Sequence, residues 1–88
     1  MQSDAKKIEI ETILQLMYRD YPDVVNVNQL CIMLGNISTK SAYKLLHTDT
    51  ISYFKIGRTY KIPKIHVVVY LSSILIDKSG IHFHALPH

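Results

Sequence analysis

Several features that would reveal the class of a protein are missing from this 88-residue chain. It contains no tryptophan and a single cysteine, Cys31, which excludes a disulfide within the chain and suits a reducing compartment. No apolar stretch reaches the roughly 18 residues that a membrane-spanning helix needs, and residues 65–76, the most apolar part, include two serines. The polar N-terminal residues do not resemble a signal peptide. We therefore expect a cytoplasmic protein that has no membrane partner.

Signs of catalysis and of metal binding are also missing. The chain has no glycine-rich phosphate loop and no pair of carboxylates at a spacing that suggests acid–base catalysis. Tyr43 lacks the cluster of basic residues that would accompany the tyrosine nucleophile of a recombinase. His82, His84 and His88 make a histidine-rich C-terminal segment, but no second pair of ligands accompanies them, so we favour a loose tail over a metal site. We expect no enzymatic activity, no cofactor and no metal.

A localised basic charge is the first feature that indicates a function. The formal net charge of the chain is +3. Residues 38–64 contain six lysines and arginines against one aspartate, a net charge of +5, whereas the rest of the chain has four basic against six acidic residues, a net charge of −2. A basic patch confined to one part of a small domain indicates a polyanionic partner. The alternative, a merely solvated face, is less favoured because the patch coincides with the motif that follows.

Residues 26–46 are predicted to form two short helices joined by a tight turn. Asn26 can cap the first helix and Gln29 can reach back to it, which makes a capping box. Gly35 ends this helix, and Ser38 can cap the second. The second helix has an inward apolar face and an outward polar face, namely Ala42, Leu45 and Leu46 against Lys40, Lys44 and His47. One packed helix followed by one that exposes lysines is typical of a helix-turn-helix, whose second helix lies in the DNA major groove.

Ile32 breaks the polarity pattern of the first of these helices. The apolar residues of that helix, among them Leu30 and the buried thiol expected at Cys31, share one face, and Ile32 lies opposite to them. We favour the interpretation that the N-terminal helix covers Ile32. The alternative is that Ile32 is exposed and contacts a partner.

Two further helices flank this unit. Residues 5–19 are predicted to form a packing helix whose apolar stripe consists of Ile10, Ile13, Leu14 and Met17. Leu16 and Tyr18 lie off the stripe and are candidates for contacts with a partner. Residues 63–76 contain three consecutive valines, which favour a strand, but the length and the leading proline favour a helix with a wide apolar band. Residues 77–88 are predicted to form a flexible tail.

Residues 51–62 are predicted to form a β-hairpin. Phe54 and Ile56 alternate with Lys55, and a two-residue connection that starts with Gly57 suits a type II′ turn. The hairpin also carries Arg58 at its tip. A short basic hairpin that follows a helix-turn-helix is typical of a wing, whose tip reaches the minor groove or the phosphates beside it.

Together these segments resemble the excisionase-type, MerR-related winged helix-turn-helix family. The similarity covers about residues 25–75, and its most specific part is the block Gly-Arg-Thr-Tyr-Lys-Ile-Pro over residues 57–63. The sequence departs from the family pattern at Asn36, an extra residue in the helix–helix turn, and at Ser52, where the family often has proline. The resemblance implies an α+β, mainly helical fold: a winged helix-turn-helix with an added N-terminal helix and a two-stranded β-hairpin wing.

The resemblance also implies a function. It points to a sequence-specific double-stranded DNA-binding protein, an excisionase-like factor of a phage or integrative element that directs a recombinase or integrase toward excision and that associates with itself on DNA. Two alternatives stay open: a transcriptional regulator of the same fold, and a protein-interaction module that uses the apolar C-terminal helix. The candidate DNA-binding residues are Ser38, Thr39, Lys40, Ser41, Tyr43 and Lys44 on the second helix, and Lys55, Arg58, Tyr60 and Lys61 on the wing.

Overall fold

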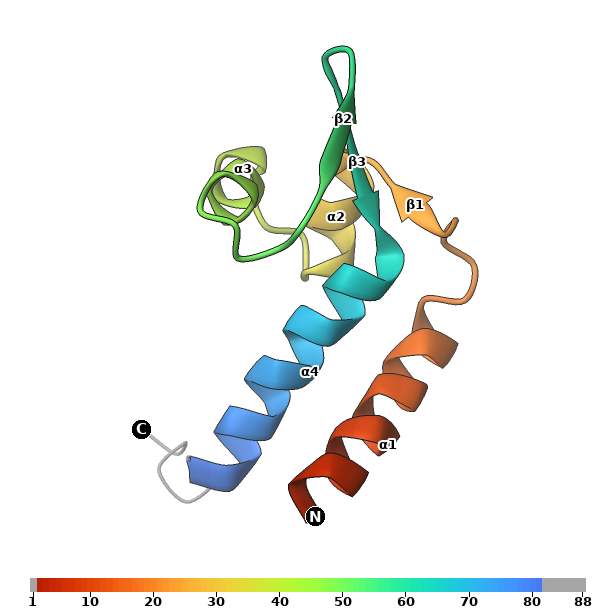
Figure 1. Cartoon of the computed structure of the whole chain (residues 1–88), viewed down its shortest axis with the longest axis vertical. Coiled ribbons are helices and arrows are strands. Elements are labelled where there is room, and N and C mark those ends of the chain that lie inside the picture. The colour runs from red at the N-terminus through yellow and green to blue at the C-terminus, as the bar shows by residue number, and fades with distance from the viewer. Residues whose placement is uncertain (1, 82–88) are drawn as a thin grey trace.

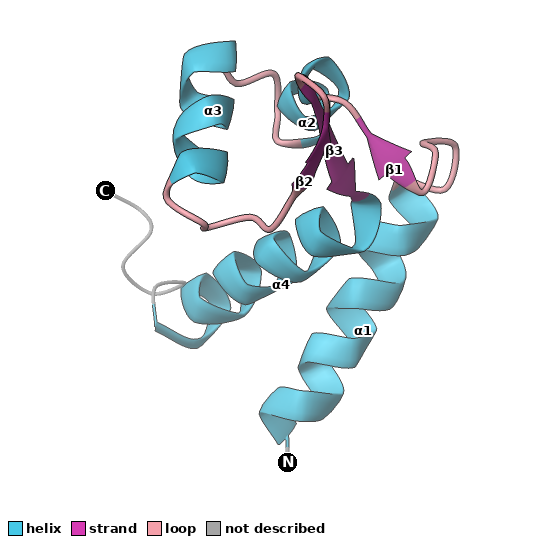
Figure 2. Ribbon diagram, turned by 45° about the horizontal axis from the view of Figure 1, so that its top comes forward, coloured by secondary structure: helices cyan, strands magenta, loops and turns pink. Residues whose placement is uncertain are grey.

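A computed structural model describes residues 2–81 of the chain and the side chains of residues 6–76. Within this part, four helices and a three-stranded antiparallel sheet follow one another in the order α1 (Gln2–Met17), β1 (Val24–Val25), α2 (Val27–Met33), α3 (Thr39–His47), β2 (Phe54–Ile56), β3 (Thr59–Pro63) and α4 (Lys64–Ile81) (Figure 2). The predicted fold class, α+β and mainly helical, is confirmed.

The elements divide the molecule into two ends (Figure 1). At one end α1 packs against α4. At the other end lie α3 and the hairpin of β2 and β3, whose turn is the part of the chain farthest from the two long helices. Between the ends, α2 packs against α3 and β3. The segments with predicted DNA contacts are therefore grouped at one end, away from α1.

Local capping signals set the bounds of α2 and α3. The backbone N–H of Gln29 donates to the side chain of Asn26 at 2.8 Å, and the backbone N–H of Asn26 donates to the side chain of Gln29 at 2.9 Å, which completes the predicted capping box. Gly35 adopts φ +90° and Asn36 follows with φ +65°, two left-handed conformations that these residue types tolerate. The hydroxyl of Ser38 accepts a hydrogen bond at 3.1 Å from the backbone N–H three residues further on. All three cap predictions are confirmed.

Among the described residues, the buried core beneath α3 and the hairpin draws on every element except α1 and β2. Its fully buried side chains come from β1, α2, α3, the loop before β2, β3 and α4, in that order Val25, Leu30, Leu46, Ile51, Ile62 and Val67. Burial of one such side chain contributes about 1.5–3 kcal/mol. Because both α3 and β3 contribute to this core, the exposed face of α3 is held at a defined position relative to the hairpin.

The sheet contains a strand that the sequence analysis did not anticipate. β1 pairs antiparallel with β3, which places Val25 opposite Ile62 at the centre of the core. The predicted two-stranded wing is therefore one edge of a three-stranded sheet in the order β1-β3-β2. A strand of two residues leaves no alternating pattern to detect, and its existence depends on the distant partner strand.

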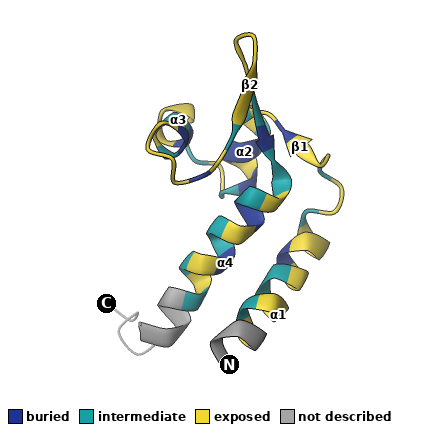
Figure 3. Ribbon diagram, in the orientation of Figure 1, coloured by how far each residue is buried: buried dark blue, intermediate teal, exposed yellow. Residues whose placement is uncertain are grey.

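The register of the hairpin separates its apolar residues. Phe54 pairs with Lys61, and Lys55 pairs with Tyr60. Directly paired residues share a face of the sheet, so Phe54 and Ile56 lie on the face opposite to Tyr60. That face is not covered: the side chains of Phe54 and Ile56 are 46% and 63% exposed. The hairpin thus has one packed face toward α3 and one apolar face toward solvent, and β2 is exposed along its length (Figure 3).

The predicted apolar stripe of α1 is correct only in part. Leu14 is buried, but Ile13 and Met17 are exposed. Tyr18, which was a candidate for a partner contact, is half-buried, and its hydroxyl donates to the backbone carbonyl of Met33 at 2.7 Å. The prediction for Tyr18 is therefore corrected: it packs α1 onto the end of α2. Because α1 has α4 as its main neighbour, a narrower face is buried than the stripe suggested.

The interpretation that the N-terminal helix covers Ile32 is wrong. The side chain of Ile32 is 54% exposed. α1 packs along α4, and a hydrogen bond from Tyr18, the residue after α1, to the backbone carbonyl of Met33 connects this region to α2. Whether Ile32 is covered or exposed depends on which element α1 packs against, and no local sequence pattern specifies that element.

The C-terminal segment is helical, as predicted, but the helix is longer. α4 begins at Lys64 and continues to Ile81, five residues into the stretch assigned to a tail. No proline interrupts the chain between Pro63 and Pro87, and the helix continues through Gly80. The three C-terminal histidines lie outside the described residues. Over the described residues, no helix combines the length and the apolar character needed to cross a membrane.

Candidate nucleic-acid interface

The outward face of α3 presents most of the residues predicted on the second helix. Ser38 and Thr39 at its start are exposed, and so are Lys40, Ser41 and Lys44 along its length. The opposite face carries the fully buried Ala42 and Leu46. The helix is thus anchored by its apolar side, and its polar side is open to a ligand as large as a nucleic acid (Figure 3).

The hairpin adds three basic side chains on different parts of its surface. Arg58 lies in the turn, next to Gly57, which adopts φ +62°. A positive φ at the first of two turn residues is what a type II′ turn requires, so the prediction of the turn type agrees with the backbone. Lys55 lies on the face toward α3, whereas Lys61 pairs with Phe54 on the opposite face. The structure therefore brings Lys55 close to α3 and separates Lys61 from it.

Four aromatic rings join α3 to the hairpin, and we call them the aromatic joint: Tyr43, His47, Tyr53 and Tyr60. Tyr60 is at its centre, with ring centroids 5.1 Å from Tyr43 and 5.2 Å from Tyr53. The hydroxyl of Tyr60 lies 2.9 Å from Nε2 of His47. Such aromatic pairs contribute about 0.5–1.5 kcal/mol each beyond the burial of their area. The rings of Tyr43 and Tyr60, both predicted as DNA contacts, thus contact each other.

The cations at this end have no acidic partner. Among the described side chains, none forms a hydrogen bond or ion pair with the side chains of Lys40, Lys44 or Arg58. The ammonium group of Lys55 lies 4.8 Å from the centroid of the Tyr60 ring, a cation–π contact that leaves its charge uncompensated. These positive charges therefore remain available to an external anion.

Lys64 shows the opposite behaviour, although it belongs to the same basic stretch of sequence. Its ammonium group donates to the backbone carbonyls of Tyr18 at 3.2 Å and Tyr21 at 2.8 Å. These carbonyls follow the last turn of α1, where a cation is favourable. Lys64 therefore connects the end of α1 to the start of α4 and does not contribute to the α3–hairpin face.

A hollow of about 300 Å³ lies where α2, α3 and the hairpin meet, and we call it the junction hollow. Its lining residues are Asn26, Val27 and Asn28 from the start of α2, Thr39 and Tyr43 from α3, and Arg58, Thr59 and Tyr60 from the hairpin. The sequence analysis did not select Asn28 or Thr59. Both are exposed polar residues beside predicted DNA-binding elements, but only the tertiary structure brings them together.

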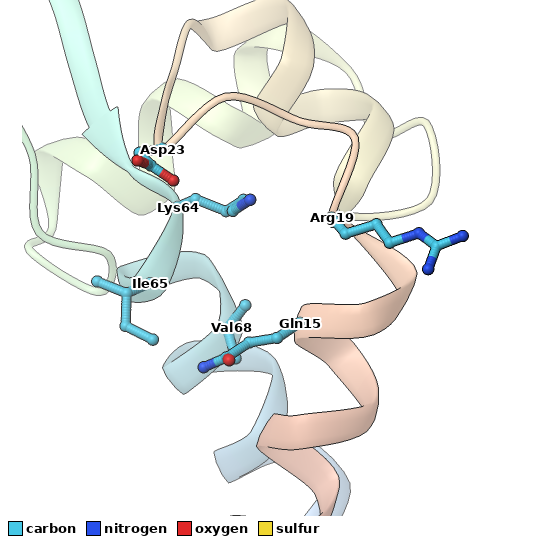
Figure 4. A pocket seen from close by; sticks show the side chains of 6 residues that line it. All are labelled: Gln15, Arg19, Asp23, Lys64, Ile65 and Val68. Carbon is cyan, nitrogen blue, oxygen red and sulfur yellow. The ribbon is translucent and has the colours of Figure 1, made fainter.

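Two other cavities lie away from the α3–hairpin face. One, of about 450 Å³, lies between α1 and α4 (Figure 4) and is lined by Gln15, Arg19, Asp23, Lys64, Ile65 and Val68. The guanidinium group of Arg19 points away from this cavity, and Lys64 is held by the end of α1. Within the described residues, no group of three or more histidine, cysteine or acidic side chains could hold a metal ion. Neither cavity carries a recognisable chemical constellation.

Comparison with known proteins returned no matching family model, no similar curated protein and no matching solved structure. The function is therefore inferred from the geometry and charge of the chain itself.

Proposed function

We propose that the protein binds double-stranded DNA as a winged helix-turn-helix, with α3 in the major groove and the β2–β3 hairpin as the wing. The observation that carries this proposal is that Lys40, Lys44 and Arg58 are exposed at one end of the molecule without a partner among the described side chains. Cations that neutralise phosphates release condensed counterions, and this release supplies much of the affinity for DNA.

The residues of the interface divide into three roles under this proposal. Lys40 and Lys44, one helical turn apart at the centre of the outward face, neutralise phosphates at the major groove, while Ser41 at the margin of that face reaches the base edges beside them. Arg58 at the tip of the hairpin enters the neighbouring minor groove, where a narrow groove attracts arginine. The main role of Tyr60 is to support this surface from within the protein, because its ring is packed in the aromatic joint.

The more specific part of the proposal is that the protein is an excisionase-like factor of a phage or integrative element. It is supported by the similarity of residues 57–63 and of the preceding two helices to that family. Such a factor would also contact a recombinase or integrase and neighbouring copies of itself on DNA. A transcriptional regulator of the same fold would use the same surface, and only its target site would differ.

Fluorescence anisotropy tests DNA binding directly. Labelled duplex from the locus of the gene and a random duplex of equal length are titrated with protein across a salt series. We expect tighter binding to the locus duplex and a steep loss of affinity with salt. The variant Lys40→Ala/Arg58→Ala should lower the slope of log K against log salt by roughly 1.8, since each phosphate contact contributes about 0.9.

The matched control removes two exposed cations from the other end of the molecule, in the variant Lys6→Ala/Arg19→Ala. It has the same net charge as the test variant and should keep the wild-type slope. If neither duplex binds at low salt, the proposal is wrong. Equal slopes for the two double variants would indicate an unspecific response to net charge.

A protein-interaction module is the second candidate, and one observation favours it. Ile32 is exposed although it lies on a helix of the central unit, and α4 exposes Ile65, Val69 and Leu75. Binding through such apolar side chains would be insensitive to salt and to Lys40→Ala/Arg58→Ala. The same anisotropy series therefore separates the two candidates.

A further inference from the structure

Most residues that line the junction hollow carry a hydrogen-bond donor. Arg58 carries a guanidinium group, Asn28 an amide, and Thr39 and Tyr43 hydroxyls, whereas the side chain of Thr59 shares the outer face of the hairpin with Ile56. No carboxylate lines the hollow. A site that offers donors and a positive charge without an acidic group selects an anion.

These donors are not used inside the protein. Among the described residues, the side chains of Asn28, Thr39, Thr59 and Arg58 have no hydrogen-bond partner, and neither does the hydroxyl of Tyr43. The two remaining polar lining residues are engaged. The side-chain oxygen of Asn26 caps α2, and the hydroxyl of Tyr60 is bonded to His47. Side-chain donors without a protein partner therefore belong to three of the elements that line the hollow.

The size and position of the hollow limit what can occupy it. Its volume of about 300 Å³ is enough for a phosphate group with part of its sugar. It lies between the N-terminal part of α3 and the turn of the hairpin, which are the two elements proposed to enter adjacent grooves. In a duplex, adjacent grooves are separated by a phosphate backbone.

We propose that the junction hollow holds one phosphate of the DNA backbone, bound by Arg58, Asn28 and Thr39. The inference rests on the proposed DNA-binding function and adds Asn28 to the interface. One phosphate bound by α2, α3 and the hairpin together sets the position of the helix and the wing on the same strand, which fixes register without reading sequence.

The test combines protein variants with single-phosphate changes in the duplex. Asn28→Ala and Thr39→Val each remove one donor; alanine suits the first turn of a helix, and valine has a helix propensity close to that of threonine. Locus duplexes with one neutral methylphosphonate at each successive position are titrated with wild-type protein and with both variants. The matched control is Thr12→Val/Gln15→Ala, which removes a hydroxyl and an amide from exposed positions of α1.

We expect each variant to bind unmodified duplex about 3- to 10-fold more weakly, as for the loss of one hydrogen bond. At one backbone position, neutralising the phosphate should weaken wild-type binding tenfold or more and lower the salt slope by about 0.9. At that position the two variants should lose little more, because their partner is already absent. The control should match the wild type throughout.

Two results would overturn the inference while leaving DNA binding intact. One is wild-type affinity of Asn28→Ala and Thr39→Val for the unmodified duplex. The other is that, at every backbone position, the loss of affinity caused by the variant and the loss caused by the methylphosphonate multiply, as independent effects do. In a third result, inorganic phosphate binds saturably, shifts the amide resonances of Asn28 and Thr59, and is not displaced by duplex. This result would assign the hollow to a free anion. Failure of the wild-type protein to bind any duplex contradicts the proposed function instead.

Discussion

The two ends of the molecule use their basic residues in opposite ways. At the α3–hairpin end, Lys40, Lys44 and Arg58 are exposed and have no partner among the described side chains. At the α1–α4 end, Lys64 is half-buried and donates to two backbone carbonyls. All four residues belong to one basic stretch of sequence. A cation marks a binding surface only when the fold leaves its charge uncompensated, and this difference is open to test by paired substitutions.

The ends also differ in how completely they are packed. Beneath α3 and the hairpin, Leu46 and Ile62 are fully buried. On α1, by contrast, Leu16 is 61% exposed and Ile8 is 64% exposed. The stability of the domain is therefore concentrated beneath the proposed interface, where a fixed geometry matters most.

The largest expected effect comes from comparing two leucines. Leu46→Ala should lower the free energy of unfolding by about 2–5 kcal/mol, because it leaves a cavity between α3 and the core. Leu16→Ala, the same change at an exposed site of α1, should stay within about 0.5 kcal/mol of the wild type. Urea unfolding followed by circular dichroism measures both. Similar losses of stability for the two variants would show that α1 is packed more tightly than the exposure of Leu16 indicates.

A comparison of two lysines separates structural from binding charge. Lys64→Met should cost about 1.5–3 kcal/mol of stability, since hydrogen bonds from a charged donor to the end of α1 are lost. Lys44→Met removes the same charge from an exposed site, so it should leave stability unchanged and lower the salt slope of DNA binding by about 0.9. Urea unfolding gives the stability of each variant, and anisotropy gives the salt slope of each variant. Equal salt slopes for the two variants would contradict the assignment of Lys44 to DNA binding and of Lys64 to the packing of the protein.

Tyr60 tests whether the aromatic joint acts through its rings or through its hydrogen bond. Tyr60→Leu should cost about 1–2 kcal/mol, because the ring contacts with Tyr43 and Tyr53 are lost. Tyr60→Phe keeps those contacts and loses only the bond to His47, so about 1 kcal/mol or less is expected. The measurement is urea unfolding, with amide relaxation of the hairpin as a second readout. A greater loss of stability for Tyr60→Phe than for Tyr60→Leu would show that the hydrogen bond to His47 stabilises the aromatic joint more than the ring contacts do.

The smallest effect concerns alkaline pH. Burial, and secondarily the neighbouring Tyr21, raise the pKa of Tyr18 above its usual value of 10.0. The folded state thus favours the neutral hydroxyl, so its contribution is complete below pH 10 and is lost as pH rises through the raised pKa. Tyr18→Phe should cost about 1 kcal/mol at pH 8, and its difference from the wild type should shrink above pH 10. A difference that is constant from pH 8 to pH 11 would contradict this linkage.

Much of the proposed interface could be predicted from local sequence. The capping box of Asn26 and Gln29, the left-handed Gly35 and the cap at Ser38 were all predicted, because each involves groups no more than four residues apart. The junction hollow could not be predicted. Asn28 and Thr59 lie far apart in sequence and carry no charge, so only the packing of α2 against β3 brings them together.

By itself, the sequence determined where α2, α3 and the hairpin begin and turn, because capping and turn preferences act between near neighbours. Only the tertiary structure decided that β1 pairs with β3, that Ile32 is exposed and that Lys64 binds the end of α1. These features depend on contacts between groups as many as 46 residues apart. Their free energy comes from the joint burial and pairing of distant groups, which no short segment contains.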